Sequence, residues 1–213
     1  MEKELSKLLF QKKELFNEGK RGMVYTSKHK DKLYLIKKRK PESTSPGTIK
    51  NEYEYNKKLN KINVGPKIYY YDDEKDFLIR DFVDGIKIEE WVKNHGEDID
   101  FKYKLLGILK EILLQCRSMD ILKINKQELT NPHKDILITK KGPVIIDFER
   151  CRFTANPKNV TQFLQYLTRP FMSKVLTNKG VIISKQKVIS LGEKYKSDNS
   201  ANNFLEILDY LKQ

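Results

Sequence analysis

The pattern of apolar residues changes once along this chain, near residues 82–86, and the change limits the folds open to it. Before it, four short segments rich in β-branched and aromatic residues predict two β-hairpins. The segments are 22–29, 32–39, 67–74 and 76–83. After it, residues 101–123 carry apolar side chains at helical spacing, and residues 157–213 are helical in character. We therefore expect an α+β fold with a β-rich lobe at 1–84 and a helical lobe at 85–213.

One helix interrupts the predicted sheet of the first lobe. Ser45 is expected to be its N-cap, with Pro46 at the first helical position. The residues that follow share one helical face, namely Ile49, Glu52, Tyr53, Asn56 and Leu59. In the second lobe, two short strands are expected at 136–139 and 143–148. A cleft between two such lobes is a natural binding site for a small ligand.

The composition excludes several classes of protein. Only two cysteines occur, Cys116 and Cys151, which argues against a disulfide scaffold and suits a reducing compartment. The three histidines are scattered, so no zinc site is expected. No apolar run approaches the roughly 18 to 20 residues of a membrane span. The first 16 residues are charged throughout, so we expect no signal peptide. The sequence predicts a cytoplasmic protein with no membrane segment.

The chain is strongly basic. It has 42 Lys and Arg residues against 29 Asp and Glu residues, so its formal charge is 42 − 29 = +13. Such a charge attracts nucleic acids, acidic proteins and nucleotide phosphates. Because the lysines are spread along the whole chain, a generally solvated basic surface is the favoured interpretation. A nucleic-acid face remains the alternative.

Glycines mark a turn near the start of the predicted sheet. Gly19 and Gly22 would let backbone amides approach a phosphate, and Lys20 and Arg21 would add positive charge. The spacing differs from that of a Walker loop, and an ordinary hairpin turn is the favoured explanation of the glycines.

A lysine lies in an otherwise apolar strand. Alternation places Lys37 on the same face as Leu33 and Leu35, so its ammonium group needs an anionic partner if that face is buried. Glu52, on the helix face described above, is the candidate carboxylate. The alternative is that the Lys37 side chain extends to solvent.

Carboxylates flank the strand pair of the second lobe. Asp147 closes the apolar run that begins at Val144, a frequent position for ligands of metals or nucleotides. Acidic residues also occur in the loop 128–135, where they could hold Mg²⁺ and orient a hydroxyl group. A turn-capping role for Asp147 and an ordinary solvated loop are the alternatives.

The order of these parts resembles the protein-kinase fold in a small form. A glycine turn, a strand lysine, a helix glutamate, a long helix, an acidic loop and Asp147-Phe148 follow one another. The chain is most similar to the RIO group and to the kinase of the tRNA threonylcarbamoylation (KEOPS) complex. The similar motifs are Leu35–Arg39, Asn63–Tyr69 and Phe82–Ile88, and the resemblance covers roughly residues 14 to 170.

The resemblance implies roles for individual residues of the first lobe. Gly19 and Gly22 would cover the phosphates of ATP, and Val24 would pack on the adenine. Lys37 would contact the α- and β-phosphates and be held by Glu52. The residues whose backbone would meet the adenine edge are Asp81, Phe82 and Val83.

In the second lobe, the resemblance implies that Asp147 binds Mg²⁺, and the loop before it departs from the family pattern. Glu128 stands at the nearest match to the catalytic aspartate, and Asp135 would replace the asparagine that binds a second metal ion. Glu149 replaces the glycine after Asp147-Phe148. An acid there is similar to the choline- and aminoglycoside-kinase branch, whose members phosphorylate small molecules.

These features predict an ATP- and Mg²⁺-dependent phosphotransferase, a serine/threonine kinase of the small atypical type. Its acceptor would be a protein substrate, with a small-molecule acceptor as the alternative. The altered loop leaves open a nucleotide-binding pseudokinase that serves as an interaction module in an RNA-processing or tRNA-modifying assembly. A third interpretation is a nucleic-acid-binding protein without a nucleotide site, although no aromatic platform supports it.

Overall fold

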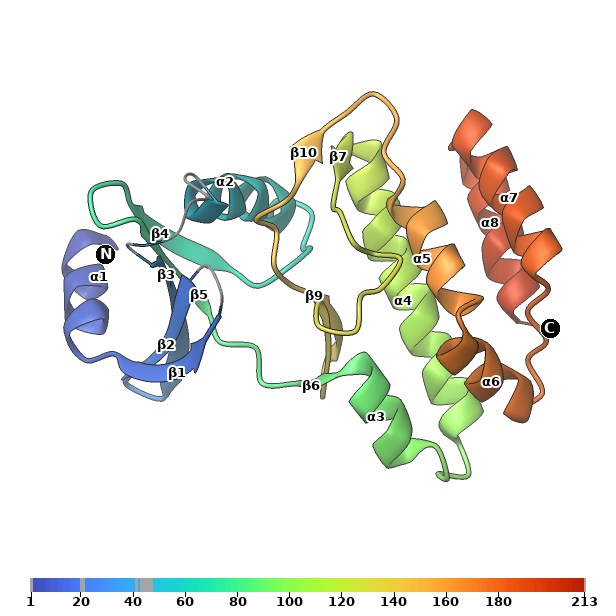
Figure 1. Cartoon of the computed structure of the whole chain (residues 1–213), viewed down its shortest axis with the longest axis horizontal. Coiled ribbons are helices and arrows are strands. Elements are labelled where there is room, and N and C mark those ends of the chain that lie inside the picture. Colours follow the sequence, from blue (N-terminus) through green and yellow to red (C-terminus); the bar gives the residue numbers. More distant parts are fainter. Residues whose placement is uncertain (1, 20–21, 41, 43–47, 213) are drawn as a thin grey trace. The chain divides into compact units, whose positions relative to one another are not determined.

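The computed structural model describes residues 2–19, 22–40, 42 and 48–212 (Figure 1). The chain packs into two compact units. The first unit comprises Met1–Asp84 together with Ile146–Cys151, and the second comprises Gly85–Ile145 together with Arg152–Gln213. The expected α+β class is confirmed, since helices combine with antiparallel sheets. The division at residues 84 and 85 did not anticipate that 146–151 packs with the first unit.

The first unit is built on a five-stranded antiparallel sheet. Its strands are β1 (Glu14–Glu18), β2 (Gly22–His29), β3 (Lys32–Arg39), β4 (Ile68–Asp72) and β5 (Phe77–Asp81), in the order β1-β2-β3-β5-β4. Both predicted hairpins are present, as β2–β3 and β4–β5. Strand β1 pairs with β2 and forms one edge of the sheet.

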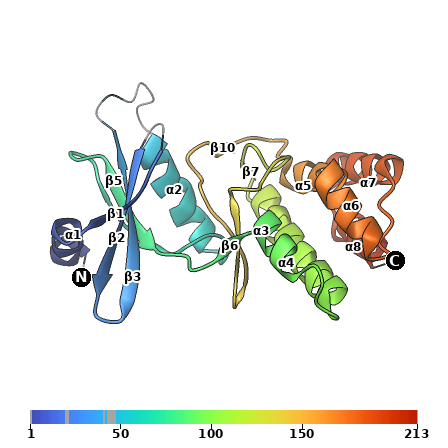
Figure 2. The same ribbon diagram turned by 60° about the horizontal axis from the view of Figure 1, so that its bottom comes forward.

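A helix covers each face of this sheet (Figure 2). Helix α1 (Glu2–Gln11) contributes Leu9 to an apolar cluster with Ile36 and Ile79. Helix α2 (Thr48–Asn60) lies on the other face, where strand alternation directs Lys37 and Arg80. Helix α2 buries four residues of the predicted face, Ile49, Glu52, Asn56 and Leu59, whereas the fifth, Tyr53, is only half-buried. The expected N-cap Ser45 and the expected first helical residue Pro46 lie outside the described residues.

The segment 146–151 is held in the first unit by its own side chains and by α2. The ring of Phe148 is fully buried against Gly65, where a Cβ atom would lie only 2.5 Å from Phe148 Cε2. Asn51 of α2 donates hydrogen bonds from Nδ2 to the backbone oxygens of Glu149, at 2.8 Å, and Cys151, at 3.0 Å. These contacts fix the backbone on both sides of Glu149.

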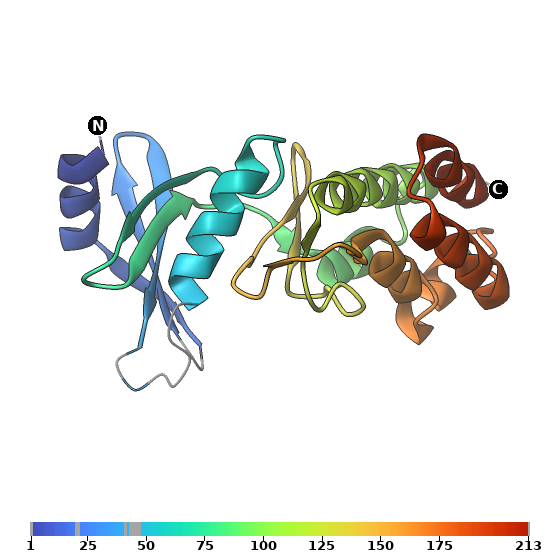
Figure 3. The same cartoon turned by 90° about the horizontal axis from the view of Figure 1, so that it is seen from above.

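The second unit is mainly helical (Figure 3). Its helices are α3 (Ile88–His95), α4 (Phe101–Ile121), α5 (Asn159–Leu167), α6 (Pro170–Asn178), α7 (Lys185–Ser197) and α8 (Ala201–Leu211). Helix α4 buries the predicted apolar stripe, including Leu105, Leu109 and Ile112, and packs against α5. Helices α7 and α8 extend this packing from α5. Among the described residues, no helix is long and apolar enough to cross a membrane.

Short strands complete the second unit. They are β6 (Ile86–Lys87), β7 (Ile124–Asn125), β8 (Ile136–Thr139), β9 (Gly142–Ile145) and β10 (Arg152–Phe153). Strand β8 matches the prediction, whereas the second predicted strand ends at Ile145 instead of residue 148. The strand stops there because Asp147 has a left-handed backbone, with φ 63°, which cannot continue a β-ladder.

Candidate functional site

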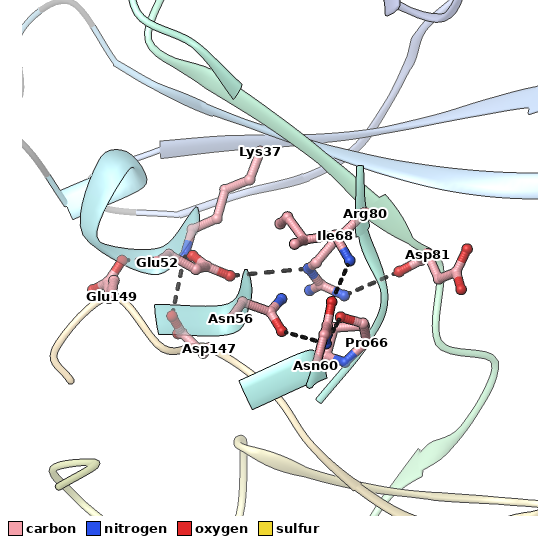
Figure 4. Close-up of polar contacts among 10 residues, drawn as sticks. All are labelled: Lys37, Glu52, Asn56, Asn60, Pro66, Ile68, Arg80, Asp81, Asp147 and Glu149. Atoms are coloured by element: carbon pink, nitrogen blue, oxygen red, sulfur yellow. Dashed lines mark hydrogen bonds and ion pairs between the residues drawn. The ribbon is translucent and has the colours of Figure 1, made fainter. Parts of the chain in front are cut away.

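Lys37 is the centre of a charged cluster in the first unit (Figure 4). Its Nζ atom lies 2.6 Å from Oε2 of Glu52, 3.1 Å from Oδ1 of Asp147 and 3.1 Å from Oε2 of Glu149. One cation therefore contacts carboxylates from α2 and from both sides of Phe148. The prediction that Lys37 faces inward and pairs with Glu52 is confirmed by this geometry.

Two opposing effects set the protonation of Lys37. Burial alone would lower the pKa of its ammonium group. The negative charges of Glu52, Asp147 and Glu149 outweigh burial and hold the pKa of Lys37 above its ordinary value. Lys37 is therefore a fixed positive charge at neutral pH.

Glu52 is the most buried member of the cluster. Its side chain is 1% exposed, and its Oε1 atom lies 3.9 Å from Nε of Arg80. A buried carboxylate needs compensating charge, which Lys37 and Arg80 provide from two sides. Glu52 therefore lies between two cations, Lys37 of β3 and the buried Arg80 of β5.

Asp147 combines exposure with an uncommon backbone conformation. Its side chain is 42% exposed, the highest value among the three carboxylates around Lys37. Its φ of 63° lies in the left-handed region, which costs a non-glycine residue about 1 to 2 kcal/mol. Such conformations persist where the surroundings determine them and cluster at functional sites. The buried ring of Phe148 next to it supplies that constraint.

The carboxylates of Glu52, Asp147 and Glu149 form a group with the composition of a divalent-metal site. One oxygen atom from each lies within 4.8 Å of the others. Counted as formal charges, the three carboxylates contribute −3 and Lys37 contributes +1, so this group has a formal net charge of −2. Carboxylate oxygens are the protein ligands that Mg²⁺ prefers. Asp147 and Glu149 are accessible enough to fit such an ion, whereas Glu52 is enclosed.

Backbone segments come close together at the glycine turn, as expected of a turn whose amides approach a phosphate. Gly19 N donates a hydrogen bond to Gly22 O at 2.9 Å. A Cβ atom at Gly22 would lie 2.9 Å from the backbone oxygen of Lys38, so a side chain there would clash with β3. Lys20 and Arg21, expected to add charge to this turn, lie outside the described residues. Val24 follows on β2, half-buried and opposite Lys37 in the strand register.

The segment expected to meet a nucleotide base begins at Asp81, the last residue of β5. The backbone N–H of Asp81 donates to Lys67 O at 2.8 Å, and that of Phe82 donates to Leu33 O at 3.3 Å. The Phe82 ring meets the ring of Phe16 edge-on, with centroids 5.4 Å apart. Within the described ranges, no backbone oxygen accepts a hydrogen bond from the N–H of Val83. Of the three predicted residues, Val83 therefore retains a backbone donor for a ligand.

The two predicted residues of the acidic loop belong to the second unit. Glu128 has a left-handed backbone, with φ 75°. Asp135 pairs through Oδ2 with Nζ of Lys126 at 2.9 Å, and the Lys126 side chain is only 4% exposed. The Asp135 carboxylate is thus already neutralised by a buried ammonium group. Sequence reasoning did not anticipate this pair.

No protein-family model matches this chain, and no curated protein matches it at a significant level.

The structure brings together three of the predicted residues, Lys37, Glu52 and Asp147. It adds Glu149 and Arg80, which sequence reasoning had not placed in the site. Glu149 stands out in the sequence as an acid two residues after Asp147, and this spacing was the available signal. The arrangement provides a fixed cation beside accessible carboxylates, which suits a ligand made of phosphate groups and a divalent metal ion.

Proposed function

We propose that the protein is an ATP- and Mg²⁺-dependent phosphotransferase with a protein-kinase-like fold. The observation that carries the proposal is the convergence of Lys37, Glu52 and Asp147 at 2.6 and 3.1 Å. In kinases, a strand lysine paired with a helix glutamate binds phosphates, and an aspartate before phenylalanine binds the metal ion. The same residue types meet here within one unit.

Each residue of the cluster has a task in this proposal. Lys37 binds the α- and β-phosphates, and Glu52 fixes the direction of its side chain. Asp147 and Glu149 would hold Mg²⁺, which when bound neutralises phosphate charge and orients the transferred group. The backbone near Gly22 lies close to the phosphates because no side chain intervenes. Most of the rate enhancement would come from positioning and charge stabilisation.

Glu128 is the proposed general base. Its carboxylate would accept the proton of a serine or threonine hydroxyl as that oxygen forms a bond to the γ-phosphorus of ATP and the bond to ADP breaks. The left-handed backbone at Glu128 supports this assignment, because strained residues persist where the fold determines their position. A protein is the proposed acceptor, and a small-molecule alcohol is the alternative suggested by Glu149.

The proposal is tested by comparing two neighbouring lysines. Lys37→Met removes the proposed phosphate ligand, whereas Lys38→Met removes an equal charge on the opposite face of β3, near the ring of Phe10. With γ-labelled ATP and Mg²⁺, we expect Lys37→Met to lose at least 100-fold of the transfer to protein substrates, about 3 kcal/mol of transition-state stabilisation. Lys38→Met should retain wild-type activity. Equal activity of the two variants would refute the site.

A second candidate function is a nucleotide-binding interaction module without turnover. The observation that favours it is the ion pair between Lys126 and Asp135. In this pair Lys126 already binds the carboxylate that was expected to bind a second metal ion. This candidate predicts that Mg²⁺–ATP raises the melting temperature of the protein while no labelled phosphate is transferred. A transfer rate that falls sharply in Glu128→Gln would eliminate it.

A further inference from the structure

Arg80 is an enclosed cation behind the Lys37 cluster. It precedes Asp81 at the end of β5, and alternation directs its side chain to the α2 side, opposite Ile79. The side chain is only 7% exposed. A buried guanidinium retains its charge and its five N–H donors, so the fold must supply acceptors for it. The identity of those acceptors indicates what Arg80 does.

The guanidinium of Arg80 lies between Glu52 and the backbone of Asp81 (Figure 4). Nε is 3.9 Å from Glu52 Oε1, and Nη1 donates a hydrogen bond to Asp81 O at 3.2 Å. In the part of the chain that the structure describes, Nε has no acceptor within hydrogen-bond distance, so it interacts with Glu52 as a charge. Arg80 therefore connects the carboxylate that holds Lys37 to the segment that begins at Asp81.

Two cations share the Glu52 carboxylate. Lys37 contacts Oε2 at 2.6 Å, and Arg80 approaches Oε1 from the other side. The other buried polar side chain in this space, Asn56, uses its Oδ1 to accept a hydrogen bond from Asn60 at 3.1 Å. Among the described residues, Lys37 and Arg80 are the two cations within 4.0 Å of Glu52. Removing either one would leave a buried carboxylate short of positive charge.

The charge of the cluster depends on Arg80. The carboxylates of Glu52, Asp147 and Glu149 contribute −3, and Lys37 contributes +1. With Arg80 the sum is −3 + 1 + 1 = −1, and without it the sum is −2. Without Arg80, Lys37 alone would oppose the repulsion of Glu52 by Asp147 and Glu149, and no cation would fix the Glu52 carboxylate on its Oε1 side.

We propose that Arg80 is a positioning residue that holds the Glu52 carboxylate toward Lys37 and thereby fixes the Lys37 ammonium group. Its bond to Asp81 O couples this arrangement to the proposed base-binding segment. The effect of Arg80 on phosphate transfer rests on the proposed function, whereas its effect on Lys37 can be measured without any activity.

The direct test measures how fast Lys37 is acylated by an N-hydroxysuccinimide acetate, with the modified peptide quantified by mass spectrometry. The amine reacts only when Nζ is released from its carboxylate partners, so a Lys37 side chain that is held in place is labelled slowly. We expect Arg80→Met to raise the Lys37 labelling rate several-fold and Arg80→Lys to restore slow labelling. The matched control is Arg39→Met on β3, which loses a partly exposed pair with Asp76 and should leave Lys37 labelling unchanged.

Glu52→Gln separates positioning from a general loosening of the fold. If Arg80 acts through Glu52, Arg80→Met should add no further labelling of Lys37 in the Glu52→Gln background. Circular dichroism identifies variants that are folded, and Arg80→Gln replaces Arg80→Met if the latter is not. Unchanged labelling in a folded uncharged variant, or an undiminished effect in the Glu52→Gln background, would overturn the proposal.

Kinetics provide the second readout. For labelled phosphate transfer, Arg80→Met should lower kcat/KM at least tenfold, and the double variant with Glu52→Gln should be no slower than Glu52→Gln alone. If the wild-type protein transfers no phosphate, the proposed function fails, and the labelling result still decides the role of Arg80. If the wild type is active and Arg80→Met matches Arg39→Met in both assays, the positioning role fails by itself.

Discussion

The ammonium group of Lys37 lies 3.1 Å from a carboxylate oxygen of Asp147, although 110 positions separate the two residues in the sequence. Strand alternation in β3 directs Lys37 toward α2, and the buried ring of Phe148 anchors the segment that carries Asp147. The contact therefore depends on local strand geometry and on long-range packing of an aromatic side chain.

The anchoring of Phe148 is tested at Gly65. This residue has φ +78°, and a Cβ atom would lie 2.5 Å from Phe148 Cε2. Gly65→Ala should lower the free energy of unfolding by about 2 to 4 kcal/mol, since backbone strain and steric overlap both act. The matched control is Gly107→Ala in α4, where a Cβ meets nothing within 4 Å. That change should stabilise the protein by about 1 kcal/mol in urea unfolding. Equal effects of the two substitutions would contradict the packing described at Phe148.

The backbone strain at Asp147 is separable from its charge. Asp147→Ala and Asp147→Gly both remove the carboxylate, but only glycine adopts φ 63° without a Cβ penalty. We expect the glycine variant to be more stable than the alanine variant by about 1 kcal/mol. Chemical denaturation of the two proteins measures this difference. An alanine variant as stable as the glycine variant would show that the backbone at 147 is not left-handed.

The pH dependence of stability follows from the raised pKa of Lys37. Since folding raises this pKa above the ordinary value of 10.5, the ion pairs of Lys37 contribute fully below that pH and are lost as the pH rises through the folded-state pKa. The stability advantage of wild type over Lys37→Met should therefore stay constant from neutral pH to about pH 10 and decline only beyond it. If the stability advantage of wild type over Lys37→Met already fell between pH 7 and about 9, folding would have lowered the pKa of Lys37 instead of raising it.

The Lys126–Asp135 pair predicts a stability effect in the second unit. Lys126→Met leaves the largely buried Asp135 carboxylate without its ammonium partner and should cost about 3 kcal/mol. Replacing both residues in Lys126→Met/Asp135→Leu should recover much of that loss, because the largely buried carboxylate is removed together with its ammonium partner. Thermal unfolding of the single and double variants measures the recovery. A double variant less stable than Lys126→Met would argue against a mutual pair.

Some parts of the site could be predicted from the sequence because they depend on local periodicity. Lys37 faces α2 because strand residues alternate, and Glu52 faces the sheet because it shares a helical face with Ile49. Asp147 was identified as a candidate from its position after an apolar run. Its contact with Lys37 does not follow from local patterns, since nothing local indicates where residues 146–151 pack.

Other features could not be derived from sequence patterns. The strand expected to reach residue 148 ends at Ile145, because the left-handed backbone of Asp147 interrupts it. Arg80 lies within an apolar strand. Its burial is compensated by the negative charge of Glu52 and by a hydrogen bond that it donates to Asp81 O. The Lys126–Asp135 pair likewise depends on how the loop folds back on itself. Such contacts are determined by tertiary packing and produce no regular spacing of residues in the sequence.

The central claim is most directly tested by phosphate transfer from γ-labelled ATP in the presence of Mg²⁺, with wild type compared with Asp147→Asn. Asparagine tolerates the left-handed backbone and nearly matches aspartate in size, so the variant should stay folded while losing the negative charge. The account predicts transfer by the wild type and at least a 100-fold loss in Asp147→Asn, about 3 kcal/mol of transition-state stabilisation. Equal transfer by the two proteins would contradict it.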